Sequence, residues 1–124
     1  MKKIPLKYSV AESTEQIKKS LADKGFTVFS DIDHQENAKG ADLKMPSSRV
    51  LIFGNPVAGT KLMQKDISVS LDLPMRLAIV DDGGKTLLIH QTMEDFVANY
   101  QLENHPVLAG IEALFKELAS ELNA

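Results

Sequence analysis

Apolar and polar residues alternate in several short stretches of the chain, and this spacing predicts β-strands. The clearest is FTVFSDID, residues 26–33, where strict alternation places Ile32 on the buried face and Asp31 on the opposite one. Residues 49–53 form a nearly continuous apolar run, which indicates a buried strand. A shorter strand is expected at residues 6–10.

The segment MRLAIVDDGGKTLLIHQ, residues 75–91, contains two further apolar runs separated by DGG at residues 82–84. Aspartate and glycine accept the positive φ angles of a tight turn, so we expect an antiparallel hairpin here. Residues 67–73 also alternate, but Pro74 interrupts them. Both a strand and an irregular lead-in to the hairpin are compatible with that pattern.

Apolar residues spaced three and four positions apart predict helices. A capping-box pattern at Ser13, which has a glutamine three residues later, predicts a helix start, and Gly25 suits the end of that helix. Thr92 carries a similar start signal and predicts a short helix. Pro106 fits the first turn of a last helix, whose broad apolar stripe is typical of a helix lying on a sheet.

Together these elements predict an α+β fold in which residues 1–124 make one domain. A β-α-β opening leads into a mostly antiparallel sheet, and the two main helices, the first and the last, pack on one face of it. Residues 34–48 are polar and contain Gly40 and Pro46. We expect them to form a loop or a short helix over the surface.

Composition narrows the classes of partner. The chain carries 14 Lys and Arg against 17 Asp and Glu, a net charge of −3, and has no basic cluster able to neutralise a row of phosphates. We therefore expect no nucleic-acid partner. The absence of cysteine excludes disulfides and thiolate metal sites and is compatible with a reducing cytoplasm. No apolar run suits a signal peptide or a membrane span, so we expect a cytoplasmic protein without a membrane partner.

The stretch VLIFGNPVAGTK, residues 50–61, looks at first like a nucleotide-binding phosphate loop. Such a loop requires Gly-Lys followed by Ser or Thr, because the lysine reaches the outer phosphates and the hydroxyl holds magnesium. Here the order is Gly59-Thr60-Lys61, which rotates each side chain by roughly 100° about a helix axis. Pro56 also removes one backbone N–H group. We interpret the segment as a Gly/Asn/Pro turn that leaves a strand.

The acidic run DIDHQE, residues 31–36, contains residue types that bind metals. A helix-loop-helix calcium loop needs glycine at the sixth position, where this run has Glu36. A zinc site would need two or three further ligands, and the other imidazoles in the chain are His90 and His105. We expect no metal and no cofactor, and interpret the run as a strand end whose Asp33 caps a helix.

Arg76 stands at the start of an apolar strand, four residues after Asp72. If Pro74 bends the chain, the two side chains form a buried ion pair that fixes the loop. The alternative is an outward-facing Arg76 without that pair, which is free to bind an anionic ligand.

Three segments follow one another in a distinctive order: GFTVFSDIDHQENA, VLIFGNPVAGTKLMQ and SLDLPMRLAIVDDGGKTLLIHQT. In this order the chain resembles, over nearly its whole length, a bacterial and archaeal family known as domain of unknown function 302. The resemblance implies a β-α-β-β-β-β-α arrangement similar to the TATA-box-binding-protein class, a likeness of fold that does not imply DNA binding. Family members often carry an aromatic residue followed by Asn-Asp where this chain has His90-Gln91-Thr92. The family brings no established reaction.

The leading hypothesis is a small soluble module that binds or senses a small-molecule ligand; no catalytic residue is assigned. Distinctive polar residues concentrate in three segments: the one around His34, the loop from Asn55 to Met63, and the stretch from Asp72 to Arg76. We expect these segments to meet in one shared polar hollow. One alternative is an enzyme that uses His34 as general base or metal ligand, with Asp33 orienting it. Another is a structural protein that self-associates, for instance as a homodimer, through an edge strand. The predicted binding residues are His34, Asn55, Thr60, Met63, Asp72 and Arg76.

Overall fold

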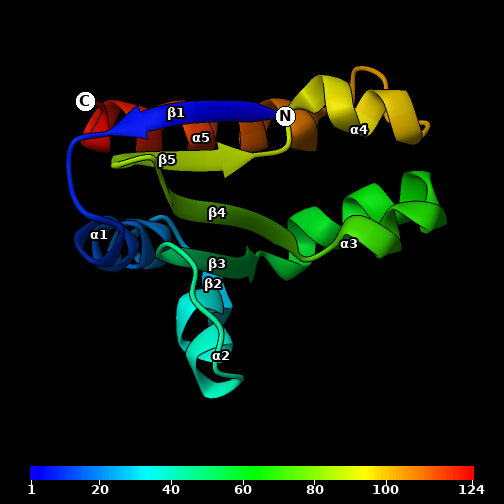
Figure 1. The fold of residues 1–124 in the computed structure, drawn as a ribbon. Helices are drawn as coiled ribbons and strands as arrows, with labels where there is room; N and C mark the ends of the chain where they lie inside the picture. The colour runs from blue at the N-terminus through cyan, green and yellow to red at the C-terminus, as the bar shows by residue number, and fades with distance from the viewer.

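The computed structural model describes residues 1–124 and contains one five-stranded antiparallel sheet (Figure 1). The strands lie in the order β1-β5-β4-β3-β2, so the first two strands of the chain form the two edges. The predicted α+β fold with a mostly antiparallel sheet is confirmed. The elements are β1 (Lys2–Leu6), α1 (Val10–Asp23), β2 (Thr27–Asp33), α2 (His34–Gly40), β3 (Ser48–Gly54), α3 (Pro56–Lys65), the 3₁₀ helix η1 (Ile67–Asp72), β4 (Met75–Asp82), β5 (Lys85–His90), α4 (Met93–Asn99) and α5 (Pro106–Leu122).

The two long helices, α1 and α5, cover the same face of the sheet, as predicted. α1 packs on β3 and β4, and α5 packs on α1 and β1. Alternate strand residues point toward these helices, and Phe53 of β3 meets Phe115 of α5 edge to face with ring centroids 6.2 Å apart. The strand residues buried in this core are Ile4, Leu6, Leu51, Phe53, Met75, Leu77, Ile79 and Leu88.

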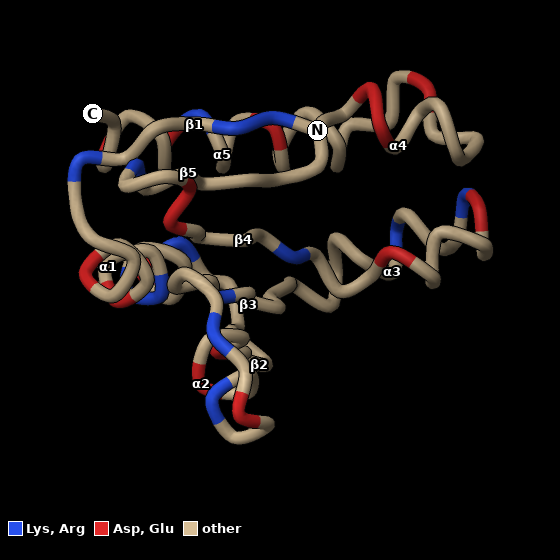
Figure 2. The backbone as a smooth tube through the Cα atoms, viewed as in Figure 1, with Lys and Arg blue, Asp and Glu red and all other residues tan.

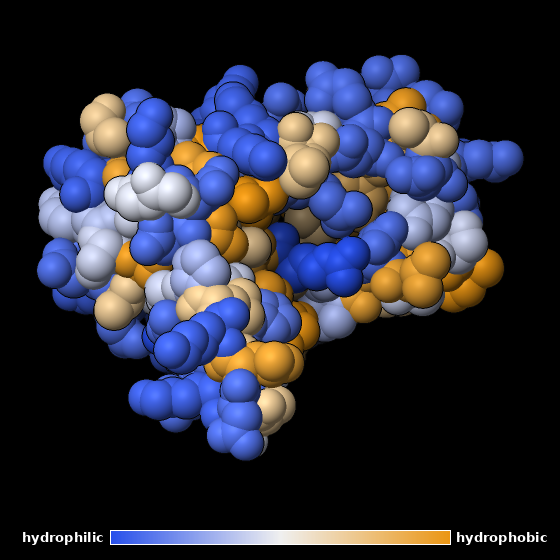
Figure 3. Space-filling model, viewed as in Figure 1, coloured by the Kyte–Doolittle hydropathy of each residue, from blue (hydrophilic) through white to orange (hydrophobic).

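The opposite face of the sheet carries no helix and is only partly shielded from solvent. Apolar side chains lie beside polar ones over this surface, with a hollow near the start of β4 (Figure 3). Val50, Ile52, Ala78 and Ile89 line a shallow groove there. We call this side the uncovered face.

A β-bulge at Phe29 interrupts the alternation of β2. One extra residue reverses the phase of every residue that follows it. Asp31 therefore lies on the helix-covered face, where its carboxylate accepts hydrogen bonds from Arg49 and Lys18. Ile32 borders the groove on the uncovered face. The predicted placement of Ile32 and Asp31 was wrong, because the apolar pattern does not mark the bulge.

The first strand and the first helix both begin earlier than predicted. β1 spans Lys2–Leu6, not residues 6–10. Ser9 is the N-cap of α1, and its hydroxyl accepts the backbone N–H of Glu12 at 3.1 Å. Ser13 is instead buried inside the helix. The pair Ser9 and Glu12 has the same spacing as a capping box, so the correct start signal was present four residues upstream.

The segment after β3 is the start of helix α3, not a turn. Asn55 is its N-cap, and the Asn55 Oδ1 atom accepts the backbone N–H groups of Val57 at 2.9 Å and Ala58 at 3.3 Å. Pro56 occupies the first turn, where its missing N–H is not needed. Residues 67–73 form neither a strand nor an irregular lead-in, because most of them belong to η1. α3 and α4 project beyond the ends of the strands (Figure 1).

Several predicted boundaries are confirmed. β4 and β5 form the antiparallel hairpin, with Gly83 at φ 62° and Gly84 at φ 91° in its turn. Thr92 caps α4 through a capping box, and Pro106 lies in the first turn of α5. Asp33 caps the short helix α2, whose first residue is His34.

Candidate functional site

The six predicted binding residues do not meet in one hollow. Three of them line a pocket beside α3, two border the groove on the uncovered face, and one lines neither space. The segment interpreted as a Gly/Asn/Pro turn is instead the ten-residue helix α3, which carries Thr60 and Met63 along its length. The first group is Asn55, Thr60 and Met63, the second is His34 and Arg76, and the remaining residue is Asp72.

The pocket beside α3 lies where this helix leaves β3, and it has a volume of about 240 Å³. α3 forms one wall, and β2, η1, the start of β4 and α5 form the others. We call it the α3 pocket. Its lining residues are Phe26, Phe29, Gly54, Asn55, Pro56, Ala58, Gly59, Thr60, Leu62, Met63, Ser70, Leu73, Pro74, Met75 and Ile111.

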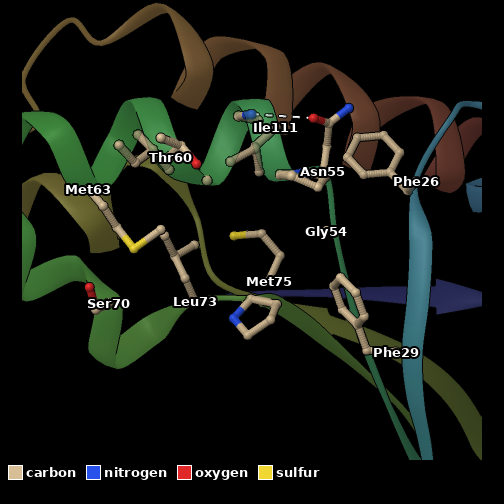
Figure 4. Close-up of a pocket in the computed structure, with 15 residues that line it drawn as sticks. Phe26, Phe29, Gly54, Asn55, Thr60, Met63, Ser70, Leu73, Met75 and Ile111 are labelled. Atoms are coloured by element: carbon tan, nitrogen blue, oxygen red, sulfur yellow. Dashed lines mark hydrogen bonds between the residues drawn. The ribbon is translucent and has the colours of Figure 1, made fainter.

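The walls of the α3 pocket are mainly apolar. Figure 4 shows Met63, Leu73 and Met75 side by side, with the ring of Phe29 near one end. Phe29 is 54% exposed although it is aromatic, since the bulge holds it outside the core. Gly54 makes room for that ring, because an added Cβ would lie only 3.4 Å from it.

The polar atoms of the α3 pocket are few, and the chain already uses most of them. Asn55 Oδ1 accepts two backbone N–H groups of α3. The Ser70 hydroxyl donates to the backbone oxygen of Ile67 at 2.7 Å. Thr60 is exposed on α3, so its hydroxyl and the Asn55 amide nitrogen are the polar groups that a guest could reach. The pocket therefore offers an apolar space with a small polar margin.

Asp72 and Arg76 do form the predicted contact, but at the surface. Arg76 Nη2 lies 3.3 Å from Asp72 Oδ1, and the Arg76 side chain is 56% exposed. The other carboxylate oxygen of Asp72 accepts the Tyr100 hydroxyl at 2.5 Å. That hydrogen bond raises the pKa of Tyr100. Asp72 thus ties η1 to the end of α4, and it is not free for a ligand.

Both aspartates of the DIDHQE run are engaged in the fold. Asp31 lies between Arg49 and Lys18, and the hydrogen bond from Arg49 lowers the pKa of Asp31. Asp33 accepts the backbone N–H of Glu36 at 3.0 Å and caps α2. His34 is exposed, and no group of three or more His, Asp or Glu side chains comes together as a metal site.

Sequence reasoning missed the aromatic and apolar part of the pocket. Phe29 enters it because of the bulge, and Leu73 and Met75 enter it because η1 curls beside α3. Neither event has a periodic signature. The available signal was Asn55-Pro56, which is a good N-cap and first-turn pair and predicts that a helix starts here.

Charges are spread over the whole molecule. Figure 2 shows Lys and Arg interspersed with Asp and Glu along the chain, without a continuous basic strip. No helix combines the length and the apolar character that crossing a bilayer would require.

Two groups of known proteins resemble this chain. Over 83 residues it is 42% identical to a protein of Brucella suis named fluoride-specific ion channel FluC 1 and to one of Brucella melitensis named FluC 2. These matches cover 66% of this chain and 33% and 31% of the two relatives, so the chain spans about a third of their length.

A solved structure and a family model cover nearly the whole chain. The crystal structure of an uncharacterised conserved DUF302 protein from Bacillus stearothermophilus superimposes with a TM-score of 0.82 at 18% identity, over 98% of this chain and 97% of that one. This confirms the fold. The model of the family described as domain of unknown function DUF302 matches residues 2–122. The chain therefore belongs to the DUF302 family, as its sequence predicted.

Proposed function

We propose that this chain is a binding module whose α3 pocket takes a small, largely apolar molecule. The observation that carries the proposal is the pocket itself: about 240 Å³ bordered by Met63, Leu73 and Met75, with Phe29 exposed at one end. Ligand sites are typically concave, mostly apolar and marked by a few polar groups. This volume lies slightly below the roughly 300 Å³ at which drug-sized pockets begin, which favours a small guest.

The energetics favour an apolar guest over a charged one. A guest that covers Phe29 and the neighbouring methionines removes apolar surface from water, which is worth roughly 25 cal/mol per Å². Methionine side chains adapt their shape to different guests because they are flexible and polarisable. No charged side chain lines the pocket, so an ionic guest would lose hydration without gaining a partner.

A polar group on the guest would find partners near the start of α3. The Asn55 amide nitrogen donates, and the Thr60 hydroxyl both donates and accepts. These two residues would orient a guest without supplying most of its affinity. The predicted roles of Asn55, Thr60 and Met63 are thus kept in this proposal, whereas His34, Asp72 and Arg76 have no part in it.

A sensing role is supported by the relatives. The similar segment makes up about a third of proteins named as fluoride-specific ion channels. A ligand-binding module joined to another activity is a common way to make that activity respond to a small molecule. We infer a cytoplasmic setting for this module, which fits the complete lack of cysteine.

Methyl NMR of the five methionines tests the proposal. Toluene, indole and cyclohexanol serve as probes, with glycerol as a polar control. We expect saturable shifts of the Met63 and Met75 methyl signals, and none at the exposed Met1 and Met45.

A matched pair of variants locates the binding. Gly59 lines the α3 pocket and Gly110 lies in α5 outside it, and an added Cβ at either position has no neighbour within 4 Å. Gly59→Leu should abolish the shifts and Gly110→Leu should leave them intact. If none of the three probes binds, or if both variants behave alike, the α3 pocket is not a ligand site.

A further inference from the structure

His90, the last residue of β5, lies on the helix-covered face with 7% of its surface exposed. Its ring stacks on Phe115 of α5, with the ring centroids 3.8 Å apart and the planes inclined by 2°. The Nδ1 atom lies 2.8 Å from the backbone oxygen of Gln91. The Nε2 atom is buried and has no hydrogen-bond partner. Buried polar atoms nearly always have a partner, so this atom requires an explanation.

The contact at Nδ1 decides which nitrogen carries the proton. A carbonyl oxygen only accepts, so Nδ1 is the donor and Nε2 keeps its lone pair. Burial lowers the pKa of His90, and the charges of Lys2 and the amino terminus lower it further, against the raising effect of the Gln91 contact. The ring is therefore neutral at neutral pH, and Nε2 is an acceptor that lacks a donor.

His90 and Phe115 line a hollow of about 340 Å³ between β1, the start of α4 and α5, which we call the His90 hollow. Its walls are apolar around Phe115, but Lys2, Glu112 and Lys116 also line it. None of these three charged residues takes part in the ion pairs of the chain. The hollow thus has an unpaired acceptor buried in its wall, beside unpaired charges that are more positive than negative.

We propose that the His90 hollow binds a small organic acid that carries a hydroxyl group. Because Nε2 is closed off from solvent, the side chains around it must shift before the hydroxyl can donate a hydrogen bond to it, while the carboxylate would face Lys2 and Lys116. The donor is required because Nε2 can only accept, and a buried acceptor without a partner has lost its hydrogen bond to water without replacing it. The apolar walls suit the hydrocarbon frame that joins the two polar ends.

Two other occupants would also satisfy the nitrogen. A proton-free imidazole nitrogen whose partner nitrogen is held by a carbonyl is the usual arrangement in metal sites. Beyond His90, however, the hollow supplies only Glu112 as a strong metal ligand, fewer than protein zinc sites use. A buried water is the second occupant, and the test below includes it.

This inference does not rest on the function proposed for the α3 pocket. The two spaces share one lining residue, Ile111, but each also has a methionine reporter of its own. Met93 lines the His90 hollow, whereas Met63 and Met75 line the α3 pocket. Failure of one proposal can therefore be told apart from failure of the other.

The test uses two probes that differ by one hydroxyl group, 4-hydroxybenzoate and benzoate. ¹⁵N NMR of the histidine rings should first show His90 Nε2 without a proton. Adding 4-hydroxybenzoate should then shift the Nε2 and Met93 methyl signals saturably, while the exposed His34 ring and Met63 do not respond. Benzoate should bind about tenfold more weakly, because it leaves Nε2 without a donor.

Two variants separate the contributions. His90→Phe keeps a ring against Phe115 but removes the acceptor, so both acids should bind with the same, weaker affinity. Lys116→Gln alters only an exposed rim residue, so it should weaken both acids by a similar factor and keep their ratio. A protonated Nε2 in the free protein, or equal binding of the two acids by the unmodified protein, overturns the proposal. An ordered water that neither acid displaces does so as well.

Discussion

The α3 pocket and the His90 hollow share Ile111 as a wall, yet their polar atoms are used in different ways. In the α3 pocket, Asn55 Oδ1 and the Ser70 hydroxyl already bond the backbone. In the His90 hollow, Nε2 has no partner. A pocket whose polar atoms are already hydrogen-bonded selects ligands by their shape and apolar area. A hollow with one unpaired buried acceptor instead distinguishes ligands by whether they carry a hydrogen-bond donor.

The walls of the two spaces also differ in what they do for the fold. Phe115 is 2% exposed and contacts both Phe53 and His90, so one wall of the hollow belongs to the core. Phe29 is 54% exposed and stands on a bulge at the sheet edge. The hollow is therefore fixed by the packing that holds the sheet and helices together, while the rim of the α3 pocket is free to change.

The largest expected effect on stability comes from truncating Phe115 of the His90 hollow, and truncating Phe29 of the α3 pocket is the matched comparison. Phe115→Ala should lower the free energy of unfolding by about 3–5 kcal/mol, because it opens a cavity in the core. Phe29→Ala should change it by less than about 1 kcal/mol, because the ring is mostly exposed. Urea unfolding followed by circular dichroism measures both. Similar losses in the two variants would contradict the distinction between a core wall and a free rim.

Removing the cap of α3 should have the next largest effect. Asn55→Ala should cost about 1 kcal/mol of unfolding free energy, because two backbone N–H groups lose their acceptor. Asn55→Asp keeps the acceptor and should leave stability nearly unchanged. It should also leave toluene binding unchanged, since toluene accepts no hydrogen bond. A loss of toluene binding in Asn55→Asp would show that the pocket does not work by apolar area alone.

Smaller gains are expected from two helical glycines. Gly59→Ala in α3 and Gly110→Ala in α5 should each stabilise the protein by roughly 0.5–1 kcal/mol, because glycine loses more backbone freedom on folding. Both positions have room for a Cβ. Thermal unfolding measures the gain, and toluene titration should show weaker binding only in Gly59→Ala. Equal binding by the two variants would place the guest elsewhere.

The titration of His90 gives an effect that vanishes at neutral pH. The pKa of His90 is lowered in the folded state, so between that value and about 6.5 only the unfolded chain takes up the proton. Stability is therefore complete above about pH 6.5 and falls as pH decreases through that window. The charged groups near the ring are Lys2, the amino terminus, Asp95, Glu112 and Lys116.

Unfolding at a series of pH values measures this dependence, and His90→Phe should remove it. Asp31, Asp66, Asp95 and Glu121 have lowered pKa values, so their contributions are lost only at more acidic pH. A decline between pH 6.5 and 5 that persists in His90→Phe would show that another group is responsible.

The sequence predicts most of the fold because the sheet and its two long helices have strong periodic patterns. The hairpin around Gly83 and Gly84 and the last helix from Pro106 are examples. The pattern fails where one residue is added, as at Phe29, or where a polar signal has two candidate positions, as at Ser9 and Ser13. Both errors concern local hydrogen bonds, which side-chain hydropathy does not record.

The candidate site was less predictable than the fold, because it depends on how segments that are distant in the sequence are placed in space. Asn55, Thr60 and Met63 line one pocket because Asn55 caps α3 and the other two residues lie along that helix. His34 and Arg76 were expected to line the same hollow as these residues. Whether they do so depends on the direction in which α3 leaves the sheet, which the apolar pattern does not record. His90 was considered only as a metal ligand, and its significance comes from a missing partner, which only coordinates reveal.

The two edges of the sheet bear on the idea that copies of this chain assemble through strand addition. Beside β1, Lys7 N donates to Leu122 O at 3.0 Å and Ala124 N donates to Pro5 O at 3.2 Å, so residues 122–124 occupy the end of that edge. At β2 the bulge breaks the regular run of backbone groups that a neighbouring strand would need. A strand added along the whole of β1 would therefore have to displace residues 122–124, and one added along β2 would meet the bulge.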